Sequence, residues 1–220
     1  MAEAVQDPKL TAGEQLAAVL RERLAEEYGP GTEIEALLRL SGGASRETWS
    51  FDALKLDGTR QPLILKRDPM DRQVEKQYEG VPGGRLNVGR LVEGRLLQLA
   101  GEAGVPMPKV PFFLDKDERT TEGFFSHRLV GEALGRRIVR DDAYAAARPK
   151  LAYQVGHAAG RFHTIPLEIL PAMRGLPAAE ELLHYRAIMD SFHQPQAGFE
   201  YGFRWLQERL QLAGERYALC

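Results

Sequence analysis

Apolar residues recur along the first third of the chain in two periods, one typical of a helix and the other of strands. Leu16, Leu20 and Leu24 are spaced four residues apart and would line one face of an amphipathic helix. Thr11 begins a capping-box pattern, and a Gly-Pro pair at 29 and 30 ends the periodicity. The pattern therefore predicts a first helix that packs through its apolar face.

Strand-like segments follow this helix and are joined by short turns. They are predicted over three ranges: Ile34 to Leu40, Thr48 to Leu56 and Pro62 to Lys66. In the second range, Trp49, Phe51 and Ala53 alternate on one face. Because parallel neighbours would need long crossover connections, we expect an antiparallel meander.

A helical pattern comes next and is followed by a second strand-like pair. Apolar residues from Leu91 to Ala100 lie on or near one helical face, and glycines and prolines stop the helix soon afterwards. Val110 to Leu114 and Gly123 to Leu129 flank a charged turn, which indicates a hairpin. The hairpin would complete an antiparallel five-stranded sheet.

Beyond Gly131 the strand patterns stop and helical periodicity takes over. Apolar residues from Leu151 to Phe162 are spaced as on one face of a helix, and we expect that face to be buried. Helical periods continue over Leu182 to Met189 and Phe199 to Leu212. The chain is therefore predicted to have an α+β fold of two lobes, in three parts: an N-terminal helix over residues 1–32, a strand-rich lobe over 33–130 and a helical part over 131–220.

Composition narrows the classes of function. The 220 residues include 29 Lys plus Arg and 31 Asp plus Glu, a formal net charge of −2, so there is no basic field for nucleic-acid binding. The single cysteine, Cys220, excludes an intrachain disulfide and a cysteine-based zinc cluster, and is typical of a reducing compartment. Residues 1–28 contain no apolar run of signal-peptide or membrane-spanning length. We therefore expect a cytoplasmic protein with neither nucleic acid nor a membrane as partner.

Three features carry candidate chemistry. Ser41 to Ser45 form a Gly-rich turn whose backbone amides could cover phosphates, although a Gly-Gly hairpin is more often only a tight turn. The turn matches neither a Walker loop nor a dinucleotide-binding motif, because both lead into a helix. Lys66 ends an apolar strand, where a lysine needs an anionic partner unless it reaches water at the sheet edge. Glu93 on the following helix is either that partner or a solvated charge.

The order of these features, before two more strands and then helices, is that of a protein-kinase-like nucleotide lobe. The residues also resemble the aminoglycoside phosphotransferase and choline kinase-like family, in the branch associated with acyl-CoA dehydrogenases. The resemblance rests on seven segments: Leu40 to Trp49, Leu63 to Pro69, Glu93 to Leu97, Gly104 to Pro108, Phe124 to Glu132, Gly160 to His163 and Arg204 to Leu206. It implies a protein-kinase-like bilobal fold, with an antiparallel five-stranded N-lobe and an incomplete helical C-lobe.

The resemblance implies a role for each matching position. Five residues would cover the ATP phosphates: Ser41, Gly42, Gly43, Ala44 and Ser45. Lys66 would bind these phosphates, and Glu93 would orient it. The backbone of three linker residues would hydrogen-bond the adenine edge: Ser126, His127 and Leu129. Ser126 replaces a larger apolar residue and indicates a roomier pocket, whereas the side chains of His127 and Arg128 are expected to point to solvent.

One departure from the family concerns catalysis. Phosphoryl transfer in the family needs a loop resembling His-Gly-Asp, a later Asn and a further Asp, which position the acceptor hydroxyl and hold Mg²⁺. The chain contains no such loop, and Arg216 to Cys220 resemble the strand that directly precedes it. The family would use ATP and Mg²⁺ to phosphorylate a hydroxyl of a small-molecule substrate. We expect this chain, without the catalytic and Mg²⁺-binding residues, to bind nucleotide weakly and to transfer nothing.

Two other interpretations remain open. The chain could be a noncatalytic nucleotide-binding or scaffold protein, a pseudokinase that uses its helices as a partner surface. It could also have a fold unrelated to kinases, in which Gly42 and Gly43 form only a hairpin. The branch suggests a functional association with an acyl-CoA dehydrogenase, and the acceptor substrate is not specified by the sequence.

Overall fold

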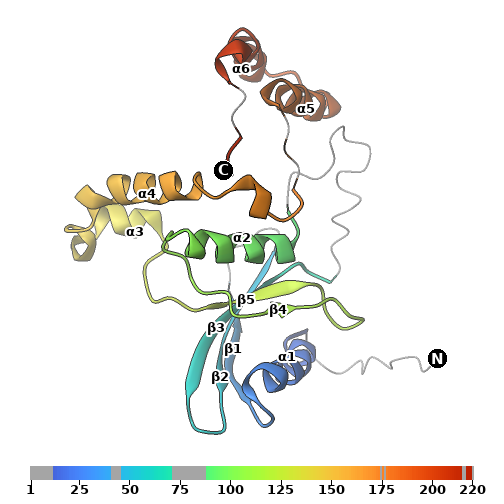
Figure 1. Cartoon of the computed structure of the whole chain (residues 1–220), viewed down its shortest axis with the longest axis vertical. Coiled ribbons are helices and arrows are strands. Elements are labelled where there is room, and N and C mark those ends of the chain that lie inside the picture. Colours follow the sequence, from blue (N-terminus) through green and yellow to red (C-terminus); the bar gives the residue numbers. More distant parts are fainter. Residues whose placement is uncertain are drawn as a thin grey trace. The chain divides into compact units, whose positions relative to one another are not determined.

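The computed structural model describes residues 12–40, 46–70, 88–173, 175, 177–214 and 217–219 (Figure 1). These residues form a mixed α+β protein, as the sequence predicts, with five strands in one antiparallel sheet and six α-helices. They fall into two compact units. One contains the sheet and Gly89–Phe162, and the other contains the residues from His163 onward.

The first unit begins with a helix and a three-stranded meander. Its elements are α1 (Ala12–Tyr28), β1 (Glu33–Arg39), β2 (Glu47–Leu54) and β3 (Arg60–Arg67). β2 pairs antiparallel with both β1 and β3, which confirms the predicted meander, and its register sets Thr48 opposite Lys66. Thr11 and its capping box lie outside the described residues.

Two strands that follow the second helix complete the sheet. α2 spans Arg90–Glu102, β4 spans Phe113–Leu114 and β5 spans Gly123–His127. The strand order is β1-β2-β3-β5-β4, so β5 lies between β3 and β4 and pairs antiparallel with both. The expected five-stranded sheet is therefore present.

The strand β4 is shorter than the predicted Val110 to Leu114. Pro111 has no backbone N–H to donate, so a regular ladder cannot extend through it. The pairing continues beyond β4 only as separate bonds, from Phe125 N to Phe112 O at 3.1 Å and from His127 N to Lys109 O at 2.8 Å. This irregular end of the hairpin leads directly into the linker that follows β5.

One face of the sheet packs against α1. Strand alternation turns Phe51 on β2 and Phe125 on β5 toward this face, where both are fully buried. The helix contributes the predicted stripe of Leu16, Leu20 and Leu24, which is buried in the same cluster. The apolar periods therefore identified the packing face of both the helix and the strands.

The opposite face of the sheet is more polar and is partly covered by α2, so the two helices lie on opposite sides of the sheet (Figure 1). Phe124 on β5 points away from α1 and contacts α2, because a Cβ added at Gly94 would lie 2.9 Å from the Phe124 Cβ. The register pairs Phe124 with Lys66, so Lys66 projects from this face as well. Lys66 and α2 are thus on the same side of the sheet.

Helices follow the sheet: α3 (Gly135–Arg140) and α4 (Arg148–Phe162) in the first unit, α5 (Ala178–Ser191) and α6 (Ala197–Gln207) in the second. The helix α4 confirms the predicted helix, but the expected buried face is wrong. Val155 is 64% exposed, and none of the described α4 residues is buried. Leu151, Ala158 and Phe162 on this apolar face are only partly buried, so the described residues cover the face incompletely. None of the helices that the structure describes has the length and apolar character needed to cross a membrane.

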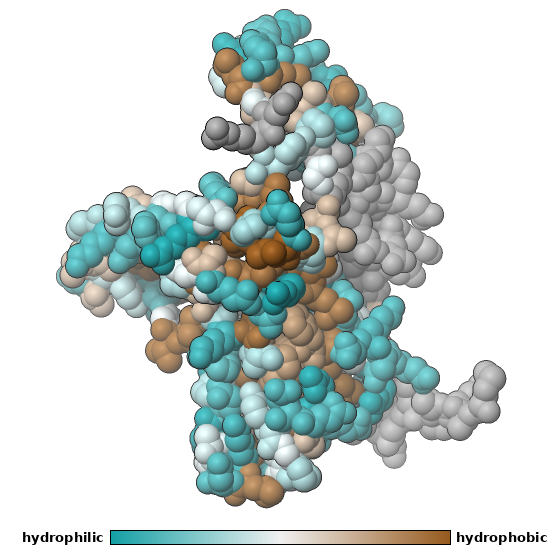
Figure 2. All heavy atoms as spheres, viewed as in Figure 1, coloured by the Kyte–Doolittle hydropathy of each residue, from teal (hydrophilic) through white to brown (hydrophobic). Residues whose placement is uncertain are grey.

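In the second unit, α5 and α6 border a hydrophobic cleft of about 510 Å³. Leu182 and Tyr185 line it from α5, and Trp205 and Leu206 line it from α6. Other apolar side chains of this unit, such as Leu183, remain at the surface, where Figure 2 shows hydrophobic residues among hydrophilic ones. The second unit therefore buries fewer of its apolar side chains than the sheet does.

Candidate functional site

Lys66 and Glu93 are brought together by β3 and α2. Lys66 is the penultimate residue of β3, and Glu93 lies in the first turn of α2. Lys66 Nζ is 3.7 Å from Glu93 Oε1, so the predicted ion pair is present. The side chain of Lys66 is 43% exposed and that of Glu93 is 23% exposed. The lysine is thus not buried among its apolar neighbours but half exposed beside a carboxylate.

Two arginines also contact the Glu93 carboxylate. Arg90, three residues earlier on α2, has a side chain only 1% exposed and pairs with Glu93 Oε2. Arg46 directly precedes β2, and its Nη1 lies 3.4 Å from the same oxygen. Three cations therefore surround one carboxylate, and two of them compete for one oxygen.

The described part of this cluster contains further carboxylates. Asp68 Oδ1 lies 3.6 Å from Arg90 Nε, and Glu122 Oε1 accepts the backbone N–H of Arg90 at 3.2 Å. Burial, and then the nearby charges of Arg90 and Arg46, lower the pKa of the Lys66 ammonium below its usual 10.5 despite its carboxylate partner.

Three positions are expected at an adenine edge: Ser126 and His127 are the last two residues of β5, and Leu129 lies in the linker that follows. Ser126 is buried and pairs with β3, whereas Leu129 is exposed. The His127 N–H donates to Lys109 O, so this amide already has an acceptor. The Leu129 N–H has no acceptor among the residues that the structure describes.

Arg128 contradicts the expectation that its side chain points to solvent. Its Nη1 donates to Ser50 Oγ at 2.9 Å, and its Nη2 donates to Asp52 Oδ1 at 2.6 Å. Strand alternation puts Ser50 and Asp52 on the same face as Thr48. The guanidinium therefore fastens the linker to the polar face of β2, an interaction that sequence reasoning missed.

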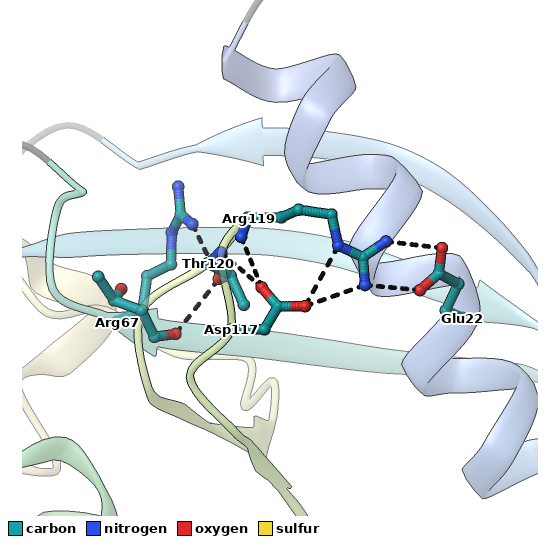
Figure 3. A network of polar contacts seen from close by, with 6 residues as sticks. Glu22, Arg67, Asp117, Arg119 and Thr120 are labelled. Carbon is teal, nitrogen blue, oxygen red and sulfur yellow. Dashed lines mark hydrogen bonds and ion pairs between the residues drawn. The ribbon is translucent and has the colours of Figure 1, made fainter. Parts of the chain in front are cut away.

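A second polar network joins α1 to the C-terminal end of β3 (Figure 3). Arg119 donates to both carboxylate oxygens of Glu22, at 2.8 Å each, and these bonds lower the pKa of Glu22. Arg119 also donates to Asp117, which accepts the backbone N–H of Thr120. The Thr120 hydroxyl accepts from Arg67 Nη1 at 3.1 Å. The network thus reaches the residue that follows Lys66.

Arg67 ends this network in a buried ion pair with Glu47. Its Nε and Nη2 lie 2.9 and 2.8 Å from Glu47 Oε2, and both side chains are at most 10% exposed. The indole N–H of Trp49 donates to the same oxygen at 3.2 Å, and Arg39 Nη2 is 3.3 Å from the other oxygen. Because Lys66 directly precedes Arg67, this pair fixes the strand end from which Lys66 projects.

The Gly-rich turn Ser41 to Ser45 lies outside the described residues. The flanking strands meet as in a hairpin, since the Leu40 N–H donates to Thr48 O at 2.8 Å. The role of the turn itself therefore stays a prediction from the sequence.

Sequence reasoning missed Arg46 and Arg90, although both had a signal. Strand alternation sets Arg46 on the face of Thr48, and a spacing of three residues sets Arg90 beside Glu93 on the helix surface. Neither arginine adjoins an apolar run as Lys66 does, so no ion pair was predicted for either of them.

The comparisons with known proteins leave the chain without a family. No protein-family model matches the sequence. No curated protein gives a significant match. Within the part of the chain that the structure describes, no three His, Cys, Asp or Glu side chains are grouped to hold a metal ion. The geometry defines an α+β protein with a cation-rich polar sheet face, and its function has to be argued from that face.

Proposed function

We propose that this chain provides the nucleotide-binding lobe of a protein-kinase-like phosphotransferase, similar to aminoglycoside phosphotransferases and choline kinases. The observation that carries the proposal is the ion pair between Lys66 on β3 and Glu93 on α2, with 3.7 Å between Nζ and Oε1. In protein kinases, a lysine on the third strand contacts nucleotide phosphates, and a glutamate on the following helix orients it. The two residues have the same order and the same elements here.

The bilobal, kinase-like fold belongs to this proposal. It is supported by the five-stranded antiparallel sheet, by α2 between β3 and β4, and by the helices after β5. The sequence contains no His-Gly-Asp loop, and its one asparagine is Asn87. The activity proposed for these 220 residues is therefore nucleotide binding, while phosphorylation of a small-molecule hydroxyl is proposed for the family that they resemble.

ATP fits the chemistry of the cation-rich face. Lys66 would bind phosphate oxygens, Glu93 would hold its ammonium in place, and the Leu129 N–H would donate to the adenine edge. Mg²⁺, when bound with the nucleotide, would neutralise phosphate charge. The described residues include no group of three His, Cys, Asp or Glu side chains that could hold this ion.

Isothermal titration calorimetry of the full chain with ATP tests the proposal. Lys66→Met removes the cation, and Glu93→Gln removes the charge that orients it. Each is expected to weaken ATP binding at least about tenfold, because a hydrogen bond to a charged group contributes about 1.5–3 kcal/mol. Arg95→Gln is the matched control, since Arg95 lies on α2 but pairs with Glu102 at the surface. The affinity of this variant for ATP should equal that of the wild type.

Absence of ATP binding by the wild-type chain would overturn the proposal. Unchanged affinity in Lys66→Met would remove Lys66 from the site. Thermal unfolding of each variant, measured alongside, shows whether a loss of binding is separate from a loss of fold.

A noncatalytic nucleotide-binding or scaffold protein is the second candidate. It is favoured by the apolar face of α4, where Val155 is exposed, because exposed apolar patches are typical of partner surfaces. The two candidates share the nucleotide site and differ in chemistry. Transfer of the ATP γ-phosphate to a small-molecule alcohol by the purified chain would contradict the noncatalytic candidate and the expected inactivity.

A further inference from the structure

The polar face of the sheet presents a second accessible cation beside Lys66. Glu47 is opposite Arg67 in the register, and Thr48 is opposite Lys66. Arg46 precedes Glu47, so alternation places it on the face of Thr48 and Lys66. Its side chain is 33% exposed. A ligand that contacts Lys66 on this face is therefore within reach of two cations from neighbouring strands.

Arg46 is attached to Glu93 by one long contact. The 3.4 Å between its Nη1 and Glu93 Oε2 exceeds the usual 2.7–3.2 Å of an N–H···O hydrogen bond. The same oxygen is paired with the buried Arg90, and the other oxygen is paired with Lys66. If Arg46 leaves, both oxygens of Glu93 keep a cationic partner. The exchange of Arg46 to another anion therefore leaves no carboxylate oxygen uncompensated.

We propose that Arg46 is a second phosphate ligand of the nucleotide site, which exchanges its contact with Glu93 for the phosphates of a nucleoside triphosphate bound at Lys66. The planar guanidinium offers several N–H donors in a fork that matches phosphate oxygens. Arg90 cannot take this role, because its side chain is only 1% exposed. The inference rests on the proposed nucleotide binding.

Three ligands separate phosphate binding from other contributions of Arg46. ATP contains the base and the phosphates, adenosine contains only the nucleoside, and inorganic tripolyphosphate contains only the anion. Calorimetry compares the wild-type full chain with Arg46→Gln, Arg46→Lys and the control Arg95→Gln, which loses the same charge from the surface of α2.

Arg46→Gln is expected to weaken the binding of ATP and of tripolyphosphate at least about tenfold and to leave the affinity for adenosine unchanged. Arg46→Lys should fall between wild type and Arg46→Gln, because a lysine keeps the charge but loses the fork. Arg95→Gln should bind all three ligands as the wild type does.

Equal ATP affinity in wild type and Arg46→Gln would overturn the inference and leave nucleotide binding intact. An equal loss for ATP and adenosine would also overturn it, because Arg46 would then act through the fold. A wild-type chain that binds no ATP would contradict the proposed function, and tripolyphosphate would still decide whether Arg46 binds a phosphate anion.

Discussion

The two carboxylate oxygens of Glu93 contact three cations, of which Lys66 alone can lose its proton under ordinary conditions, since arginine remains charged. The pKa of Lys66 lies below 10.5 because burial, Arg90 and Arg46 disfavour the charged form. A phosphate anion beside the ammonium favours that charged form and raises its pKa. The protonation of Lys66 is thus linked to the binding of an anion.

ATP binding should therefore take up a proton at alkaline pH. Between the pKa of Lys66 in the free protein and its higher pKa in the complex, the free lysine is partly neutral while the bound lysine is charged. In that window, affinity falls as the pH rises. Calorimetry over a series of alkaline pH values, in buffers of different ionisation enthalpy, measures the proton uptake directly.

The Lys66→Arg variant is the control for this proton. It keeps the positive charge but does not titrate, so proton uptake should disappear while some affinity remains. Undiminished uptake in Lys66→Arg would assign the proton to another group.

Glu22, in the network of Figure 3, and Glu47, which pairs with Arg67 at the end of that network, should contribute very differently to stability. Glu47→Gln leaves the buried guanidinium of Arg67 without its carboxylate, which should lower the free energy of unfolding by about 3–5 kcal/mol. Glu22→Gln breaks an exposed pair with Arg119 and should lower it by less than about 1 kcal/mol. Urea denaturation measures both values.

The two substitutions are matched, because each removes one negative charge and preserves the shape of the side chain. A loss at Glu22 equal to or larger than the loss at Glu47 would show that burial does not govern the strength of these pairs.

Among the elements, α2 packs closely against the sheet at a glycine, Gly94. A Cβ at Gly94 would lie 2.5 Å from Phe113 Cε1 and 2.9 Å from Phe124 Cβ, so the helix backbone touches β4 and β5. Gly101, near the other end of α2, has open space where a Cβ would stand. Because Glu93 precedes Gly94, the seating of the helix also sets the distance between Glu93 and Lys66.

Gly94→Ala should lower the free energy of unfolding by about 1–3 kcal/mol through overpacking, although alanine favours a helix by about 1 kcal/mol. It should also weaken ATP binding, because α2 must shift away from the sheet. Gly101→Ala, in the same helix, should be neutral or stabilise by up to about 1 kcal/mol. Chemical denaturation compares them, and a change of the same sign and size in both would contradict the close contact at Gly94.

The elements could be predicted from the sequence where local spacing decides them. The stripe of Leu16, Leu20 and Leu24 and the alternation at Phe51 identified faces that are buried together. The length of β4 and the exposure of α4 could not be predicted in this way. Both depend on non-local contacts. The length of β4 depends on the ladder that is interrupted at Pro111, and the exposure of α4 depends on whether another element covers Val155.

Over the whole molecule, the candidate site could be predicted as far as the order of elements allows. Lys66 follows an apolar run in its strand, and Glu93 lies on the next helix. Their pairing could therefore be predicted from the order of the elements, before any interatomic distance was known. Arg46 meets Glu93 across 47 residues, and Arg128 meets Asp52 across 76. Arg46 and Arg128 do not differ in local sequence pattern from ordinary surface arginines. Only the register of the sheet and the path of the linker reveal their partners.

The two tryptophans of the sequence are divided between the two compact units. Trp49 is buried in the sheet and donates to Glu47, while Trp205 is partly exposed on α6, with Arg209 4.3 Å from its ring centroid. Each unit therefore has its own intrinsic fluorophore. Trp205→Phe would leave Trp49, buried in the core against α1, as the single tryptophan, so that unfolding of the sheet could be followed by its fluorescence without a label.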